Sequence, residues 1–322
     1  VPWVKGTPMY VSSHIDLAWQ NPSLHRMMSN ENPHPPSKKV MDAIIKYGAM
    51  ANRYPDQGTT VRSKIAEING LEGPENVLLG NGSSEVFDMI FRSFLAPGEE
   101  VIQHTPCFGI YKLRCAAVGG QLVSVPMRFT GKELAYDPAA IVAAITPRTK
   151  VIVVANPNNP TGNFMDPGDF VRIAQTGIPF VIDEAYIEYA GLGKSQVGLI
   201  KTYRNVIITR TLSKAYGLAG LRVGYLLAGE PVIEQLLKVK QPYNLNAFSQ
   251  AAARVVMENL TPFKERIERI LVDRDKLMAA LTALPGVETF PTRANFILFR
   301  TPLPADKIYT GLLQRGVLIR SM

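Results

Sequence analysis

Short runs of apolar residues alternate with stretches of helical spacing between residues 75 and 228. In the segment 83–95, Val86, Ile90, Phe91 and Phe94 recur at the spacing of one helix face. The apolar runs are rich in Val and Ile, which suits strands buried on both faces. This alternation predicts an α/β fold with a mainly parallel central sheet. The predicted strands are residues 76–80, 99–103, 121–126, 150–155, 179–185 and 205–210.

The overall composition is that of an ordinary globular protein. The chain has 322 residues, of which 46% are hydrophobic and 19% charged, enough to bury a large core in two domains. No apolar run is long enough to span a membrane and no secretory signal stands at the N-terminus, so we expect no membrane association. Cys107 and Cys115 form neither a disulfide framework nor a zinc spacing, which favours a reduced, cytoplasmic protein.

The formal net charge of +8 raises the question of nucleic-acid binding. The basic residues are scattered, and no block of five Lys or Arg occurs. A basic surface or an affinity for small anions is therefore favoured over nucleic acid as a partner. The four histidines are dispersed, so no metal site is expected.

Side chains that can bind a ligand or take part in catalysis follow five of the predicted strands. Ligands of open parallel sheets bind beyond the carboxyl ends of the strands, so we expect these side chains to converge on one rim. In chain order they are Ser83 and Ser84, Phe108, Asn159, Asp183 with Tyr186, and Lys214 with Arg222.

The stretch GNGSSEVF, residues 80–87, predicts a phosphate site. A glycine turn that opens a helix offers free backbone N–H groups and the positive end of the helix dipole. The alternative is that Ser83 simply caps the helix. The chain has no G-x-x-x-x-G-K-[ST] motif, and residues 217–224 do not match G-x-G-x-x-G, so a nucleoside triphosphatase and a nicotinamide dehydrogenase are disfavoured.

Each remaining side chain also has a plainer interpretation. Asp183 could cap a helix or pair with an arginine, Lys214 could be a solvated charge, and Phe108 could be a core aromatic. Taken together, an amine that forms an imine, a carboxylate for a pyridinium, donors for a phenolate, a stacking ring and a phosphate cup suit pyridoxal 5′-phosphate. The glycines after Lys214 let the chain bend, so that Thr211, Ser213 and Arg222 return to the phosphate.

Nine motifs carry a family resemblance across nearly all of residues 30–320. The chain resembles the fold-type I pyridoxal-phosphate-dependent aminotransferases, and among them the histidinol-phosphate aminotransferases of the class-II family. The motifs are NENPHPPS, RYPD, NGSSE, TPCFGIY, NPNNPTG, VIDEAYIEY, TRTLSKAYGLAGLRVGY, QPYNLNAFSQAAA and RANFILFR.

The resemblance implies roles at matching positions. Lys214 is similar to the lysine that carries the cofactor aldehyde and moves the proton at the substrate α-carbon, and Asp183 to the carboxylate that keeps the pyridine nitrogen protonated. The ring oxygen would be bound by Asn159 and Tyr186, the ring face would stack on Phe108, and the phosphate would be bound by Ser83, Ser84, Thr211, Ser213 and Arg222.

Three further positions concern the substrate and the assembly. Tyr54 of RYPD is similar to a tyrosine that reaches the phosphate in the neighbouring subunit, which implies a homodimer with shared active sites. Asn30 is similar to a residue near the substrate carboxylate. Arg320 is similar to the arginine that contacts the substrate phosphate, although a solvated charge at a strand end is the plainer interpretation. The family carries another arginine, for the α-carboxylate, at a position downstream of Met322, where this sequence ends.

The resemblance also implies a large domain with a mainly parallel sheet and a smaller α+β domain. We expect an N-terminal arm at residues 1–32, belonging to the small domain, a large cofactor-binding domain at 33–245, and a C-terminal small domain at 246–322, whose counterpart in the family extends further. Within the small domain, residues 262–281 predict a helix and residues 287–300 predict strands that face the active site.

The favoured function is transamination between histidinol phosphate and 2-oxoglutarate, in histidine biosynthesis. The partners would then be a small amino donor and a 2-oxo acid. Three alternatives stay open: an aromatic amino acid aminotransferase, a threonine-phosphate-type decarboxylase, and a non-catalytic ligand-binding regulator. Tyr243 in QPYNLN favours the aminotransferase over the decarboxylase.

Overall fold

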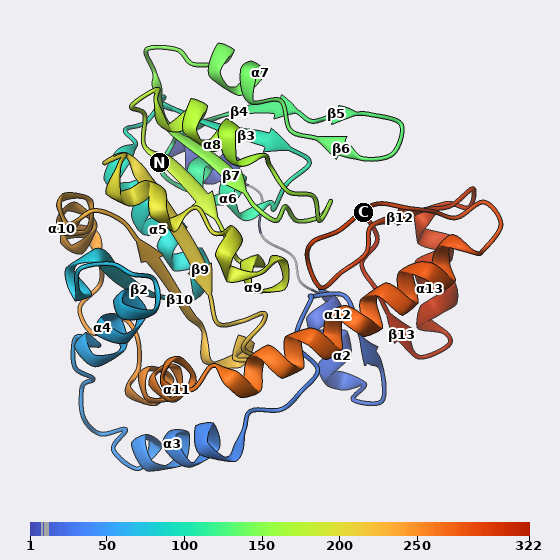
Figure 1. Ribbon diagram of the computed structural model, residues 1–322, viewed down its shortest axis with the longest axis horizontal. Helices are drawn as coiled ribbons and strands as arrows, with labels where there is room; N and C mark the ends of the chain where they lie inside the picture. Colours follow the sequence, from blue (N-terminus) through green and yellow to red (C-terminus); the bar gives the residue numbers. More distant parts are fainter. Residues whose placement is uncertain (8, 10–12) are drawn as a thin grey trace.

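The computed structural model describes residues 1–7, 9 and 13–322. A seven-stranded sheet lies between two layers of helices, as Figure 1 shows. Residues 8 and 10–12 of the predicted N-terminal arm lie outside the described residues. Within the described part, no helix is both long and apolar enough to cross a bilayer.

The sheet is parallel except at one strand, so the predicted mainly parallel architecture is confirmed. β10 runs antiparallel to both of its neighbours, β2 and β9. The strand order is β2 (Val77–Asn81), β10 (Val223–Leu227), β9 (Val206–Thr211), β8 (Phe180–Asp183), β7 (Thr149–Ala155), β3 (Glu100–Thr105) and β4 (Gln121–Pro126).

β10 is the one strand of this sheet that the sequence does not predict, because Gly224 weakens its strand pattern. The glycine is needed for packing. A Cβ on Gly224 would lie 2.3 Å from the carbonyl carbon of Gly82 and the amide nitrogen of Ser83. Only a residue without a side chain lets the start of α5 (Gly82–Phe94) lie directly on β10.

Alternate residues of the strands pack into two cores on opposite faces of the sheet, as the two-residue period of a strand requires. Ile152 and Val154 of β7 face one core, with α4 (Thr59–Ile68), α7 (Pro138–Ala143), α8 (Pro167–Ala174) and α11 (Ala247–Glu258). Val151 and Val153 face the other core, with α5, α6 (Ile110–Ala117) and α10 (Glu230–Val239). Both faces are apolar, which explains the continuous Val and Ile runs.

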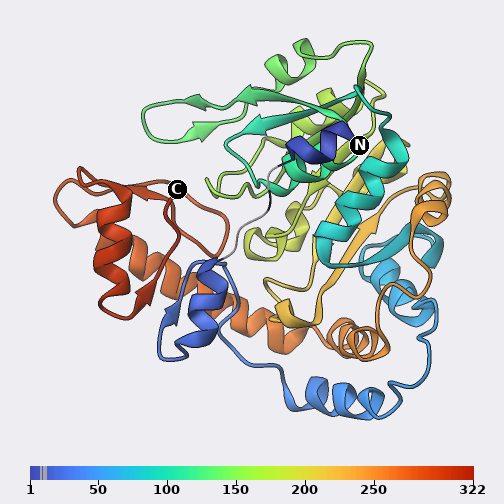
Figure 2. The same cartoon turned by 180° about the vertical axis from the view of Figure 1, so that it is seen from behind.

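A smaller group of elements lies beside the sheet and combines α2 and β1 from the N-terminal part with the C-terminal elements (Figures 1 and 2). β1 (His25–Arg26) pairs in parallel with β13 (Val317–Leu318). Ala18, Met28 and Leu318 form a separate small core there. The long helix α12 (Thr261–Thr282) confirms the helix predicted at 262–281. Only β11 (Glu288–Thr289) and β12 (Phe299–Arg300) form strands within 287–300, so that strand prediction holds only near its two ends.

The remaining elements are short or peripheral. They are the helices α1 (Pro2–Gly6), α2 (Ser13–Gln20), α3 (Lys38–Gly48), α9 (Ile187–Ala190) and α13 (Ala305–Leu313), the 3₁₀ turns η1 (Pro74–Asn76), η2 (Leu192–Lys194), η3 (Val197–Lys201) and η4 (Ala219–Leu221), and the strands β5 (Arg128–Phe129) and β6 (Leu134–Ala135).

Candidate active site

The predicted residues gather where the parallel strands end. β3, β7, β8 and β9 run in the same direction, so the residues that follow them lie along one rim of the sheet. β10 runs the opposite way and begins at Val223, opposite Asn81 at the end of β2. Arg222 therefore reaches the same rim from the other direction. The antiparallel strand, and not only the bend at the glycines, returns this arginine to the site.

Asp183 ends β8 and is 4% exposed. Its Oδ2 accepts a hydrogen bond from the Tyr111 hydroxyl at 2.6 Å, and its Oδ1 accepts one from the Ala185 N–H at 3.1 Å. Burial raises its pKa to about 6, and the Tyr111 hydrogen bond opposes this shift. Among the described residues, no Lys or Arg forms an ion pair with Asp183, so its carboxylate is available to a cationic ligand.

Lys214 lies in the turn between β9 and β10, against the N-terminal arm. Its Nζ donates to the carbonyl oxygen of Ser29 at 2.7 Å and lies 5.7 Å from the centre of the Tyr186 ring. The arm is fixed to this turn a second time, because Asn32 Nδ2 donates to the Ala215 carbonyl at 2.8 Å. The described residues place no carboxylate within 4 Å of the ammonium group.

The Tyr186 hydroxyl joins three segments that are distant in the sequence. It accepts hydrogen bonds from Asn159 Nδ2 at 3.3 Å and from Asn30 Nδ2 at 3.1 Å. Two donors on the phenol oxygen leave its own proton to be donated outward. Asn30 has a φ of 54°, in the left-handed region that Asn tolerates better than most residues. Phe296 packs edge-on against the same ring, at 5.1 Å between centroids.

Asn158 and Asn159, adjacent in the NPNNPTG loop, have different surroundings. Asn158 is fully buried and contacts His104 Nε2 at 2.9 Å, the Pro106 carbonyl at 2.9 Å and Thr161 Oγ1 at 2.7 Å. Burial lowers the pKa of His104 to about 4, so the ring is neutral at physiological pH. Asn158 therefore stabilises the loop, which presents Asn159 toward Tyr186.

Three further predicted residues form a polar cluster after β9. Thr211 Oγ1 contacts Ser213 Oγ at 2.9 Å, and Arg222 Nη1 donates to the same Ser213 oxygen at 3.3 Å. Burial lowers the pKa of Arg222, yet the described residues include no carboxylate within 4 Å of its guanidinium. An arginine that is open to solvent, contacts a buried hydroxyl and has no anionic partner among the described residues is a suitable place for a phosphate.

The start of α5 lies against this cluster. Gly82 has a φ of 70°, and its N–H donates to the Arg222 carbonyl at 2.9 Å. A Cβ on Gly82 would lie 2.2 Å from Arg222 Nη2, so the guanidinium occupies the space that a side chain would need. Ser83 and Ser84 follow in the first turn, where backbone N–H groups lack partners within the helix.

The alternative that Ser83 merely caps α5 is not what the structure shows. The N-cap residue is Asn81, and its side chain makes no capping bond. Glu85 Oε2 instead reaches back and accepts the Asn81 N–H at 2.5 Å. The hydroxyl of Ser83 is thus not used as the helix cap.

Phe108 and Tyr111 lie together at the start of α6. Phe108 is half-buried, and its ring meets the Tyr111 ring edge-on at 6.1 Å between centroids. Tyr111 is fully buried and carries the hydrogen bond to Asp183. The sequence interpretation gave Tyr111 no role. Its spacing of three residues from Phe108, across the start of a helix, is a signal that the two side chains lie close together.

Two predicted residues do not contact this group within the chain. Tyr54 is 82% exposed and stacks on the ring of Tyr243 at 4.5 Å. Arg320 is exposed, with Nη1 3.4 Å from His14 Nε2. It follows β13, and β13 runs parallel to β1, so Arg320 lies at the same end of that sheet as Ser29 and Asn30.

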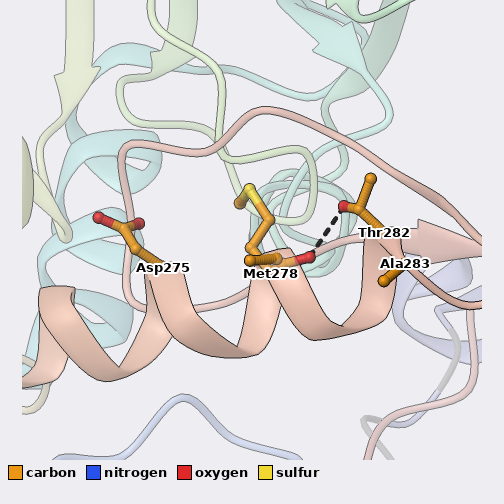
Figure 3. A pocket seen from close by; sticks show the side chains of 5 residues that line it. Asp275, Met278, Thr282 and Ala283 are labelled. Carbon is orange, nitrogen blue, oxygen red and sulfur yellow. Dashed lines mark hydrogen bonds between the residues drawn. The ribbon is translucent and has the colours of Figure 1, made fainter.

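One open hollow on the surface lies elsewhere. It is lined by residues of α12, and Figure 3 shows Met278 in its centre and the Thr282 hydroxyl bonded to the Met278 carbonyl at 2.8 Å. Asp275 is the only ionisable residue in its lining among the described residues. A single carboxylate beside small apolar groups offers no chemistry comparable to the rim of the sheet.

Besides Tyr111, the sequence interpretation missed Ser29 and Asn32, which contact the Lys214 turn, and Phe296, which packs on Tyr186. Ser29 acts through its carbonyl group, so its side-chain type holds no signal. Asn32 and Phe296 lie within motifs that carry the family resemblance, but no pattern there indicates their contacts.

Comparison with known proteins agrees with this geometry. Residues 24–322 match the family described as aminotransferase class I and II. Histidinol-phosphate aminotransferase of Thermoanaerobacter pseudethanolicus is 37% identical over 305 residues, which cover 93% of this chain and 84% of that protein. The predicted family resemblance is confirmed.

Solved structures agree in fold. Histidinol-phosphate aminotransferase of Sinorhizobium meliloti, in complex with pyridoxal 5′-phosphate, has a TM-score of 0.88 at 26% identity and covers 99% of this chain and 88% of its own. L-threonine-O-3-phosphate decarboxylase of Porphyromonas gingivalis has a TM-score of 0.80 at 22% identity, covering 91% of this chain and 88% of its own, and shows the fold alone. The predicted fold class is confirmed, and the chain belongs to the class I and II aminotransferase family.

Proposed function

We propose that this chain is a pyridoxal-phosphate-dependent aminotransferase that transfers the amino group of histidinol phosphate to 2-oxoglutarate, in the biosynthesis of histidine. The observation that carries the proposal is the position of Tyr186. Its hydroxyl is fixed by Asn159 and Asn30, and its ring lies 5.7 Å from Lys214 Nζ. An oriented phenol beside a single amine is what a pyridoxal ring requires at its oxygen and its aldehyde.

The residues present fit the cofactor at each of its functional groups. Asp183 is a buried carboxylate that forms no ion pair with the residues the structure describes, and it suits a cationic ring nitrogen, because a positive charge there offsets the cost of burying the negative one. The Thr211, Ser213 and Arg222 cluster at the start of α5 suits a phosphate. When bound, pyridoxal 5′-phosphate supplies an aldehyde that reacts with amines and a protonated ring that withdraws electrons from the substrate α-carbon.

The chain's own groups would then have separate tasks. Lys214 binds the cofactor covalently through Nζ, and as a free amine it moves the proton at the substrate α-carbon. Asp183 keeps the proton at the ring nitrogen. Tyr186 and Asn159 donate hydrogen bonds to the ring oxygen. Phe108 covers one face of the ring and excludes water.

The phosphate would be bound by the first turn of α5, which contains Ser83 and Ser84, together with Thr211, Ser213 and Arg222. The Arg222 guanidinium already lies against the Gly82 backbone, so its position at the helix start is fixed. The helix dipole and the arginine charge act on the anion together.

The donor is assigned from the relatives and from Arg320. The curated relative from Thermoanaerobacter pseudethanolicus is named for histidinol phosphate, and its alignment with this chain, at 37% identity, covers 93% of the chain. Arg320 leaves β13 on the side where the arm contacts Lys214, which suits contact with a donor's own phosphate. Asn30, which bonds Tyr186, would lie near the polar end of the donor.

Assembly as a homodimer with shared sites is part of the proposal. Tyr54 and Tyr243 form an aromatic stack that is largely exposed in the single chain. Exposed aromatic side chains of this size are typical of interfaces. Tyr54 would cross this interface to the phosphate in the partner's site.

We also propose two domains, with the part of the arm that contains α2 and β1 and the C-terminal elements forming the smaller one, while α1 packs against α6 of the larger. The shared core of Ala18, Met28 and Leu318 supports this grouping. The predicted division falls at residues 32 and 245. The buried residues of α11, such as Ala252 and Val256, pack into the core of the large sheet. This packing supports moving the second boundary beyond α11, so that α11 belongs to the large domain.

Both cysteines are free, which supports a reducing compartment such as the cytoplasm.

Single-turnover reactions with a panel of donors test the function. Purified protein loaded with the cofactor should convert histidinol phosphate to its carbonyl product when no 2-oxo acid is added. No carbon dioxide should be released. Phenylalanine, tyrosine and threonine phosphate serve as comparisons. Faster conversion of the aromatic amino acids would replace the proposed donor, and carbon dioxide from threonine phosphate as the main product would reject transamination.

A further inference from the structure

Tyr111 connects two parts of the site that are 72 residues apart. Its hydroxyl donates to Asp183 Oδ2 at 2.6 Å, and both side chains are buried. Tyr111 belongs to α6 and Asp183 ends β8, so this bond joins a helix that covers the sheet to the rim of the sheet. A buried hydroxyl on a buried carboxylate is a strong hydrogen bond, because the acceptor is charged and water is excluded.

The tyrosine ring has little freedom to move. It lies against Phe87 of α5 at 4.7 Å and against Phe108 at 6.1 Å between ring centres. A phenol fixed on two sides presents its hydroxyl in one direction. The same ring thus touches Phe108, which we assign to the cofactor's ring face, and bonds Asp183, which we assign to its ring nitrogen.

The second oxygen of Asp183 is fixed as well, since Oδ1 accepts the Ala185 N–H at 3.1 Å. With one donor on each oxygen, the carboxylate plane cannot rotate without losing a hydrogen bond. Each oxygen can still accept another hydrogen bond. The Tyr111 bond therefore determines how the free side of the carboxylate is aimed.

We propose that Tyr111 is a positioning residue for the cofactor: it orients the Asp183 carboxylate toward the ring nitrogen of pyridoxal phosphate and keeps that carboxylate ionised. This inference rests on the proposed function. Tyr111 itself need not touch the cofactor nitrogen, since it acts through Asp183.

The electrostatics of the site show what Tyr111 changes. Burial raises the pKa of Asp183 to about 6, and the Tyr111 hydrogen bond is the largest opposing influence. The other titratable groups that interact electrostatically with Asp183 are Cys107, from the loop before α6, and Glu184, the residue that follows β8. Neither is a cation, so no other group in this set replaces the tyrosine. Loss of the hydroxyl should raise the pKa of Asp183 further, and more of it would be neutral near pH 7.

The chain offers a matched control in Tyr136. Its hydroxyl is also buried and also donates one hydrogen bond of 2.6 Å, but to the backbone carbonyl of Ala155. Tyr111→Phe and Tyr136→Phe delete the same atom at comparable depth. A general loss of packing or stability should affect both variants, whereas a loss of carboxylate positioning should affect only the first.

The first experiment uses protein without cofactor. Aspartate side-chain carboxyls are labelled with ¹³C, and Asp183→Asn identifies the Asp183 signal in the pH titration. We expect the midpoint to rise by about one pH unit in Y111F and to stay unchanged in Y136F. Equal midpoints in Y111F and wild type would overturn the inference. This titration stands even if the wild-type protein proves unable to bind pyridoxal phosphate, an outcome that would reject the proposed function instead.

The second experiment measures the Kd of pyridoxal phosphate by absorbance titration. Y111F should bind about ten-fold more weakly than Y136F. In the D183N background, the same Tyr111→Phe change should have almost no further effect, because the carboxylate it acts through is gone. A ten-fold loss that persists in D183N would overturn the inference. If Y111F fails to fold, 3-fluorotyrosine placed at position 111 should lower the Asp183 midpoint, since it is the stronger donor, and an unmoved midpoint would again overturn it.

Discussion

The guanidinium of Arg210 lies 2.9 Å from the carboxylate of Glu184, and both side chains are almost fully buried. Glu184 directly follows Asp183, and Arg210 directly precedes Thr211. The ion pair therefore lies on the opposite face of the strands from the proposed site and fixes two neighbouring site residues.

Removing one member of this pair should be costly. Arg210→Met leaves Glu184 buried without its cation, and we expect a loss of about 3–5 kcal/mol in the free energy of unfolding, measured by urea denaturation. Arg210→Met with Glu184→Leu should recover much of this loss. Lys38→Met is the control, because the Lys38–Asp42 pair is exposed and should contribute less than about 1 kcal/mol. Equal losses in the two single variants would refute the assigned role of the buried pair.

In the protein without bound cofactor, ionisation of Asp183 should lower the free energy of unfolding as the pH rises. Its pKa is raised to about 6, so the folded state binds this proton more tightly than the unfolded chain does. The stability contribution is therefore full only below about pH 4 and is lost as the pH rises from there through 6, by an amount on the order of 3 kcal/mol.

Asp183→Asn lacks this titration, so its Tm should rise relative to wild type between pH 4 and pH 7. Asp42→Asn, at an exposed site, should show no such trend. Thermal melts at several pH values measure the difference. A wild-type Tm that increases relative to the Tm of D183N as the pH rises would contradict the assignment.

Arg222 should act on the cofactor's phosphate and on no other part of it. Arg222→Met is expected to raise the Kd of pyridoxal 5′-phosphate by about 10- to 100-fold, because a charge-assisted hydrogen bond is lost. The Kd of pyridoxal, which has no phosphate, should change little. Arg92→Met, in the last turn of α5, is the control for loss of charge. A similar weakening of both ligands would show that Arg222 supports the fold of the site and not the phosphate.

Arg320 should recognise the donor's phosphate. Arg320→Ala is expected to raise the KM for histidinol phosphate by about ten-fold or more, with a much smaller effect on histidinol, since the arginine–phosphate interaction is lost only with the former. Arg315→Ala, an exposed arginine just after α13, is the matched control. A loss of equal size with both donors would assign Arg320 to the fold.

The dimer can be tested by complementation. Lys214→Ala and Tyr54→Ala should each be inactive or nearly so as pure proteins. Mixed and refolded together, they should recover about a quarter of wild-type activity, because half of the dimers would contain one intact site with Lys214 from one chain and Tyr54 from the other. No recovery despite confirmed mixed dimers would place Tyr54 outside the partner's site.

The parallel core could be predicted from the sequence because strands buried on both faces consist of continuous Val and Ile runs. The rim could be predicted because polar residues follow those runs. The sequence did not predict β10, since Gly224 serves a close approach between α5 and the sheet that only the tertiary structure reveals. Tyr111 and Ser29 were missed because a phenol on a carboxylate and a carbonyl on an amine depend on pairs far apart in the chain. The roles given to Tyr54 and Arg320 concern a partner subunit and a substrate, which a single chain does not contain.

The most direct test of the central claim is to locate the covalent attachment of the cofactor. Protein saturated with pyridoxal 5′-phosphate is reduced with borohydride, digested and analysed by peptide mass spectrometry. The account predicts one modified lysine, Lys214, and an unmodified digest for Lys214→Ala. Stoichiometric labelling of another lysine, or no labelling of the wild-type protein, would contradict it.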